Sequence, residues 1–220
     1  MTLKAYTHRT TLNTTLLLAI LSCLLFNPVS ALALGNGGTA LPDFAEFTKT
    51  VQSSEANVLR GVYVPEVLAL PVSQQPAGNS GYVSNKEGEV TQFGMAAQFG
   101  NVGLLAHNHL SGRLFSQLAL GQEVRLVYGN GTVEYFVITQ ILQFQALEPT
   151  SQYSSFRDLT NDEMLTVEQV FKKVYRGERH VTFQTCIAGT ESLSWGRLFV
   201  IAIPKTQTTS GERTGPKLGR

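Results

Sequence analysis

The segment His180-Val181-Thr182-Phe183-Gln184-Thr185-Cys186 decides the fold, together with Arg197-Leu198-Phe199-Val200-Ile201-Ala202-Ile203, which follows after a short connection. Both segments are rich in β-branched and apolar residues, which favour strands. Successive side chains of a strand point to opposite faces, so Cys186 lies on the face opposite Val181 and Phe183. The two strands predict a hairpin that returns Arg197 to the neighbourhood of the thiol.

Further short apolar runs predict more strands on the N-terminal side of this pair: residues 61–65, 67–72, 102–106, 124–128 and 133–139. Asn130-Gly131 separates the last two and suits the positive φ values of a tight hairpin turn. The polar, glycine-rich stretch 73–89 predicts a long loop. So many short strands favour a mainly β fold, in which the sheet closes into a barrel, over a parallel sheet.

Two helices are predicted beside these strands. The first is short and begins near Asp43, with Phe44, Phe47 and Val51 on one face. For the second, Thr160 and Glu163 form a capping box, which predicts a helix to about Arg176 that ends at Gly177. Its apolar stripe consists of Val167, Val170, Phe171 and Val174.

The N-terminus has the pattern of an export signal. Lys4 and Arg9 precede the apolar run 16–26, and Ala31-Leu32-Ala33 follows it. This pattern predicts a signal peptide over residues 1–33, or an uncleaved N-terminal anchor. The chain is then expected outside the cell or at the cell envelope, with membrane attachment only if the segment is uncleaved. Residues 34–57 form a helical lead-in, 58–204 the barrel, and 205–220 a polar tail expected to be disordered.

Composition excludes several classes of protein. The chain has 220 residues, a net charge of +1 and two cysteines. The near-zero charge argues against nucleic-acid binding, and the cysteine count excludes a disulfide-dense scaffold or a four-thiolate zinc site. Cys23 lies in the apolar N-terminal run. If residues 1–33 are removed, Cys186 is the one cysteine left.

An unpaired cysteine in an exported protein suggests a nucleophile, although a buried cysteine acting as a small hydrophobe is the alternative. A thiol needs a base or a cation for attack on a carbonyl, and arginine is a suitable donor to the oxyanion formed. His107 ends the predicted strand 102–106, and His109 follows in a loop. His180 lies six residues, or about 20 Å of extended chain, from Cys186 and does not easily reach it. Zinc bound by His107, His109 and Cys186 is a rival interpretation, which a neighbouring arginine disfavours.

At these residues the sequence resembles the sortases, cysteine transpeptidases of bacterial cell surfaces. Residues 182–186 resemble the family's Thr-Leu-x-Thr-Cys strand, with Phe183 in place of leucine. Residues 196–202 resemble its arginine-containing last strand, and 103–107 resemble the segment that ends in Ala-Gly-His, with Ala106 in place of glycine. Residues 115–124 resemble the Phe-x-x-Leu…Gly-Asp-x-Val run that follows.

The resemblance implies an eight-stranded barrel with Cys186 as nucleophile, His107 as general acid and base, and Arg197 as the group that stabilises substrate and oxyanion. It implies attack on the Thr–Gly bond of a Leu-Pro-x-Thr-Gly-like sorting signal of exported proteins, and transfer to an amine of the envelope. Thr185 and His109 are expected to contact the substrate, and no cofactor or metal is expected. Hydrolysis instead of transfer, and a secreted barrel that only binds peptide, remain alternatives.

Overall fold

A computed structural model describes residues 41–151 and 153–206. The predicted signal or anchor (1–33), the first part of the lead-in (34–40) and most of the predicted tail (207–220) lie outside the described residues. Among the residues that the structure describes, no helix is long and apolar enough to cross a membrane.

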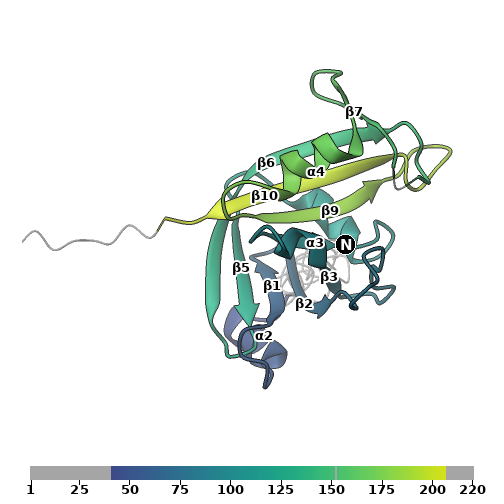
Figure 1. Cartoon of the computed structure of the whole chain (residues 1–220). Coiled ribbons are helices and arrows are strands. Elements are labelled where there is room, and N and C mark those ends of the chain that lie inside the picture. Colours follow the sequence, from purple (N-terminus) through teal and green to yellow (C-terminus); the bar gives the residue numbers. More distant parts are fainter. Residues whose placement is uncertain (1–40, 152, 207–220) are drawn as a thin grey trace, which may run out of the picture. The chain divides into compact units, whose positions relative to one another are not determined.

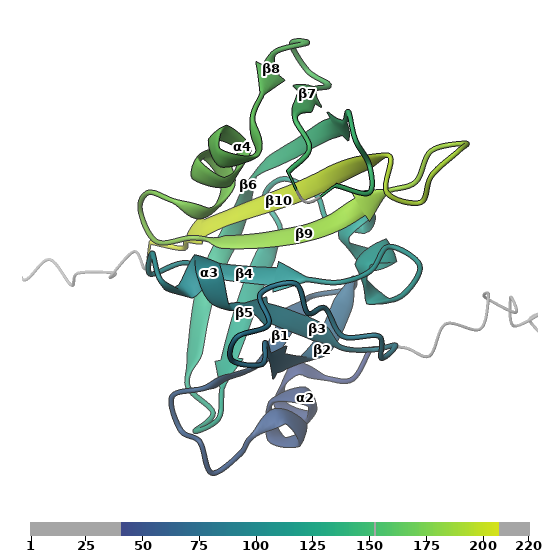
Figure 2. The same cartoon turned by 45° about the vertical axis from the view of Figure 1, so that its right-hand side comes forward.

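The described residues form one sheet of ten strands, in the order β10-β9-β4-β3-β2-β1-β5-β6-β7-β8, and β10 also pairs with β6. This extra pairing closes eight strands into a barrel, while β7 and β8 extend the sheet beyond β6 (Figures 1 and 2). The expected mainly β, closed, eight-stranded barrel is therefore confirmed. The strands are β1 (Leu59–Val64), β2 (Leu68–Gln74), β3 (Val90–Phe93), β4 (Val102–Leu105), β5 (Glu123–Tyr128), β6 (Val133–Ala146), β7 (Phe156–Asp158), β8 (Met164–Leu165), β9 (Val181–Ile187) and β10 (Gly196–Pro204).

Two pairings in this sheet are parallel, β2 with β3 and β4 with β9, and the others are antiparallel. Strand β9 lies between β10 and β4, which makes it the common neighbour of two segments far apart in sequence. Parallel strands end at the same edge of a sheet. The last residues of β4 and β9 are therefore brought together.

The two faces of β9 and β10 are buried in different ways. Phe183 and Val200 point into the barrel, where they join the interior apolar cluster and Phe115 packs edge-on against Phe183. On the outer face, Phe199 and Ile201 pack beneath helix α4 (Val167–Tyr175), which lies along β10 and β6 (Figure 1). Burial on both faces stabilises β9 and β10 by the hydrophobic effect. The less buried side chains of Cys186 and Arg197 lie where β9 ends and β10 begins.

Helix α2 (Phe44–Val51) confirms the first predicted helix, and Asp43 accepts a hydrogen bond from Ala45 N at its start. The second helix begins at Val167, so the prediction that it starts at the Thr160 capping box is wrong. The box that forms is Thr166 with Gln169.

The reason for this difference is long-range. Residues 156–158 and 164–165 pair with each other as β7 and β8, and β7 pairs with β6. Asp162 between them has φ 61°, a left-handed conformation incompatible with a helix. The predicted stop is confirmed, because Gly177 follows the helix with φ 108°.

Short elements were missed because they span too few residues to show a period. These are β3, helix α3 (Gly94–Ala97) and the 3₁₀-helix η1 (Ser111–Gln117), so the described residues hold more helices than the one or two expected. The predicted hairpin is confirmed as β5 and β6, but only Gly131 of its turn has positive φ, at 83°. Tyr128 N donates to Thr132 O, so the connection is a three-residue loop, residues 129–131, with its last residue in the left-handed conformation.

Candidate active site

Cys186 and Arg197 are directly opposite each other in the register of β9 and β10. Directly opposite residues of antiparallel strands have Cβ atoms about 5 Å apart and side chains on one face. The predicted hairpin therefore brings the guanidinium-bearing residue beside the thiol. Cys186 is half-buried and is not in a disulfide.

His107 reaches the same end of the sheet through the parallel pairing of β4 with β9. Leu105 is opposite Gln184, and Ala106 N donates to Gln184 O at 3.3 Å. Ala106 belongs to the barrel interior, and His107 follows it two residues beyond the end of β4, at the end of the sheet that carries Cys186. Cys186 and Arg197 thus lie on one face at one end of the sheet, and His107 lies at the same end.

In the described residues, no hydrogen bond joins Cys186 Sγ to His107 or Arg197. The hydrogen bonds of catalytic groups are often long without substrate and tighten when it binds. The arrangement is that of an open site, with two half-buried polar side chains on either side of a half-buried thiol.

The turn that carries His107 is packed tightly onto β9. His107 O accepts hydrogen bonds from Leu110 N and Gly112 N, both at 3.0 Å. A Cβ at Gly112 would lie 2.3 Å from Thr185 Oγ1 and 2.6 Å from Ala106 O, so glycine is required for this close approach. Thr185 Oγ1 in turn donates to Ala106 O at 2.9 Å. The turn and the strand before Cys186 are therefore fixed to each other.

The structure separates the two residues expected to contact substrate. Thr185 is on the inner face, is 5% exposed and has its hydroxyl committed to Ala106 O, so it positions the turn. His109 is exposed, and its ring stacks on that of His107 with centroids 5.4 Å apart and planes at 26°. Both imidazoles lie at the thiol end of β4, and a substrate contact by Thr185 or His109 stays a prediction from the sequence.

The Arg197 guanidinium is held by three backbone carbonyls. Nη1 donates to Ser194 O at 2.8 Å and to Gly196 O at 2.9 Å, and Nη2 donates to Pro149 O at 3.3 Å. Among residues 41–151 and 153–206, no carboxylate pairs with Arg197. A guanidinium has five N–H groups, so these contacts fix its orientation and leave two donors and the full charge for another acceptor.

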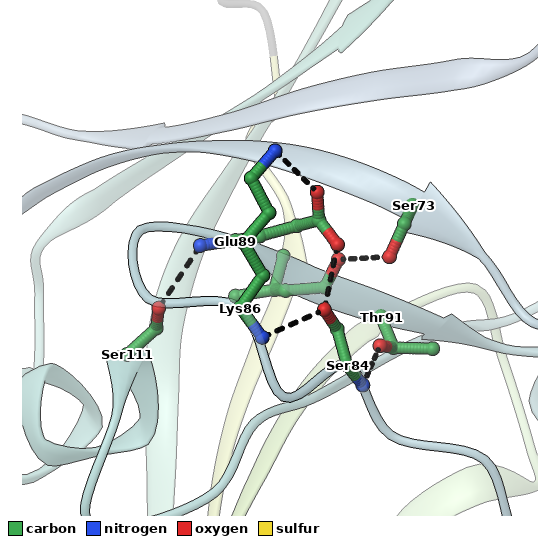
Figure 3. A network of polar contacts seen from close by, with 7 residues as sticks. Ser73, Ser84, Lys86, Glu89, Thr91 and Ser111 are labelled. Atoms are coloured by element: carbon green, nitrogen blue, oxygen red, sulfur yellow. Dashed lines mark hydrogen bonds and ion pairs between the residues drawn. The ribbon is translucent and has the colours of Figure 1, made fainter.

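The long predicted loop is fixed to the histidine turn by a polar network (Figure 3). Glu89 N donates to the buried hydroxyl of Ser111 at 3.0 Å, and Ser84 Oγ donates to the Glu89 carboxylate at 2.7 Å. Burial raises the pKa of Glu89, but hydrogen bonds from Ser84 and Ser73 and the charge of Lys86 outweigh burial and lower that pKa below its ordinary value. The network keeps loop residues 84–89 against the start of η1.

Helix α4 supports the site from the outer face. The Tyr175 hydroxyl donates to the side-chain oxygen of Gln184, two residues before Cys186 on the same face. Burial raises the pKa of Tyr175 far above its ordinary value, so the phenol stays protonated and remains a donor. This contact fixes the side chain next to the thiol along β9.

His180 is buried at the opposite end of the hairpin, as its spacing predicted. Its Nδ1 lies 2.7 Å from Glu178 O and its Nε2 lies 2.9 Å from Val174 O, so it fastens the C-terminal end of α4. In the part of the chain that the structure describes, no three His, Cys, Asp or Glu side chains gather as metal ligands.

Sequence reasoning missed the residues that hold the site together. The sequence indicates a loop around His109 and no role for Asn108, Ser111 or Gly112, yet all three make contacts with other segments. A polar, glycine-containing turn directly after a strand-end histidine was the available signal, because loops at strand ends commonly carry functional groups.

Comparison with known proteins gives a likeness of structure. No protein-family model matches the sequence, and no curated protein matches it. Several sortases are among the solved structures that resemble it. Sortase A of Listeria monocytogenes is 14% identical with a TM-score of 0.42, over 68% of this chain and 88% of that one. A Clostridium perfringens sortase D5 transpeptidase is 14% identical with a TM-score of 0.44, over 75% and 90%. Streptococcus agalactiae sortase C1 is 19% identical with a TM-score of 0.42, over 92% and 91%.

Proposed function

We propose that this chain is a cysteine transpeptidase of the sortase type, acting on exported proteins that carry a Leu-Pro-x-Thr-Gly-like sorting signal. The observation that carries the proposal is the register of β9 and β10, which sets Cys186 directly opposite an arginine with no carboxylate partner among the described residues. A guanidinium beside a thiol is a suitable donor to the oxyanion that forms when the thiol attacks a carbonyl.

The proposed reaction has two transfers. The Cys186 thiolate attacks the carbonyl carbon of the scissile Thr–Gly bond, the S–C bond forms, and the C–N bond breaks. His107 gives a proton to the leaving amine. A second amine then attacks the thioester, His107 takes up its proton, the new amide bond forms, and the Cys186 thiolate is released.

Arg197 is the proposed stabiliser of the oxyanion in both transfers. Its fixed position supports this role, because a donor that is held in place before the reaction needs little reorganisation when charge develops. The predicted export signal would place enzyme, sorting signals and amine acceptors together at the cell envelope. If the N-terminal segment stays uncleaved, it would hold the enzyme at the membrane.

Product analysis tests the function directly. A peptide containing Leu-Pro-x-Thr-Gly, as a panel over the variable position, is incubated with residues 34–220 in the presence and absence of hydroxylamine or triglycine. We expect cleavage after threonine and formation of the hydroxamate or the new peptide bond. If the threonine product forms only with water and never with the added amine, the reaction is hydrolysis and not transfer. If no peptide is cleaved and a peptide bearing an electrophile does not label Cys186, the chain is a barrel that binds peptide without catalysis.

His107 and His109 make separable predictions. His107→Gln is expected to lower kcat/KM for peptide cleavage by about 10²–10⁴-fold, the usual contribution of a general acid and base. His109→Gln is the matched control for proton transfer, since this exposed imidazole follows on the same turn. As a predicted substrate contact it should raise KM, with kcat within about threefold of the unmodified chain. Steady-state kinetics on both variants checks this. A larger loss for His109→Gln than for His107→Gln would exchange their roles.

A further inference from the structure

We infer that Asn108 is a positioning residue, which ties the turn that carries His107 to the loop that orients Arg197. The inference rests on the proposed function, because it concerns how the three groups of that site are kept in register. Asn108 Nδ2 donates to Leu193 O at 2.8 Å, across 85 residues of sequence.

The two ends of this hydrogen bond are each next to a group of the proposed site. Asn108 directly follows His107, whose carbonyl is fixed by Leu110 N and Gly112 N. Leu193 directly precedes Ser194, whose carbonyl accepts from Arg197 Nη1 at 2.8 Å. A displacement of the loop would therefore move the Ser194 carbonyl that accepts from Arg197. A displacement of the turn would move His107.

Other hydrogen bonds of the loop between β9 and β10 do not provide this connection. Gly189 N and Trp195 N donate to Ser192 O, and Ser194 N donates to Ser192 Oγ, all within the loop. Trp195 O accepts from Ala146 N and so fastens the loop to β6. Within residues 41–151 and 153–206, the hydrogen bond from Asn108 Nδ2 to Leu193 O is the one that joins this loop to the His107 turn.

The expected effect is larger on rate than on stability. Asn108 lies in a half-buried turn at the end of a closed barrel, and one hydrogen bond there contributes little to the fold. Displacement of a catalytic group by about 1 Å, by contrast, costs on the order of 10²-fold in rate. Loss of the Asn108 amide should thus leave the barrel folded and the site misaligned.

The test compares Asn108→Ala with Asn85→Ala, a matched control whose exposed side chain is not part of the hydrogen bonds that join Ser84, Glu89 and Ser111. For Asn108→Ala we expect kcat to fall about 10–100-fold with KM within about threefold, and Tm to stay within about 3 °C of the unmodified chain. Asn85→Ala should change none of these. Asn108→Gln, which keeps an amide donor on a longer side chain, should recover part of the lost kcat.

Hydrogen exchange separates this inference from the proposed function. Amides of residues 188–195 should exchange faster in Asn108→Ala than in the unmodified chain, whether or not a sorting-signal peptide is cleaved. If the unmodified chain is inactive but exchange rises, the proposed function fails and the connection stands. Unchanged exchange, a kcat within threefold in an active enzyme, or a kcat loss matched by a fall in Tm above about 5 °C would overturn the inference.

Discussion

Cys186→Ala is expected to lower cleavage of a sorting-signal peptide by at least about 10³-fold while the barrel stays folded. The reason is chemical, because alanine removes the nucleophile and leaves no route to the thioester. The fold should survive because the Cys186 side chain is half-buried and lies at the end of β9, outside the barrel's apolar clusters. Peptide cleavage and far-UV circular dichroism check the two parts of the prediction.

Cys186→Ser is the size-matched control for this substitution. A hydroxyl is far less acidic than a thiol, so we expect it to be nearly as inactive as alanine. Cleavage by Cys186→Ala within tenfold of the unmodified chain would remove the thiol from the mechanism.

Arg197→Ala is expected to lower kcat by about 10²–10³-fold, the cost of removing one fixed oxyanion donor. Arg197→Lys keeps the charge but loses the planar fork that contacts Ser194 O and Pro149 O at once, so it should recover little of the rate. Steady-state kinetics measures both effects.

Arg157→Ala is the matched control, because Arg157 is an exposed arginine on β7 that pairs with no carboxylate within the described residues. The kcat of Arg157→Ala for peptide cleavage should equal that of the unmodified chain. Equal losses in Arg157→Ala and Arg197→Ala would mean that a general loss of positive charge, and not the fixed guanidinium, explains the effect.

The parts of the fold that depend on local pattern were predictable from the sequence. Alternation in β9 assigned Phe183 and Cys186 to opposite faces, and the β9–β10 hairpin set Arg197 beside the thiol because its connection is short. The parallel pairing of β4 with β9 was not predictable in this way. It joins segments about 80 residues apart, and neither segment carries a local sign of its partner.

Helix α4 shows how a distant pairing overrides a local signal. Two capping boxes compete at its start, Thr160 with Glu163 and Thr166 with Gln169. Sequence alone does not rank them. The pairing of β7 with β6 and β8 occupies the segment around the first box, so the helix begins at the second.

The candidate site divides in the same way. Cys186, His107 and Arg197 were expected from residue type and position, because each ends or begins a strand. Asn108 and Gly112 were not, because their partners, Leu193 O and Thr185 Oγ1, belong to other segments. Contacts between loops depend on how the barrel closes, and the periodicity of apolar residues in the sequence does not predict that closure.

Intact-protein mass spectrometry tests the central claim most directly. Residues 34–220 are mixed with a Leu-Pro-x-Thr-Gly peptide without an amine and quenched in acid within seconds. The account predicts an adduct with the mass of the peptide up to threonine, mapped to the proteolytic fragment that contains Cys186 and released by hydroxylamine. Cleavage of the peptide with no adduct on Cys186, or with the adduct on another residue, would contradict it.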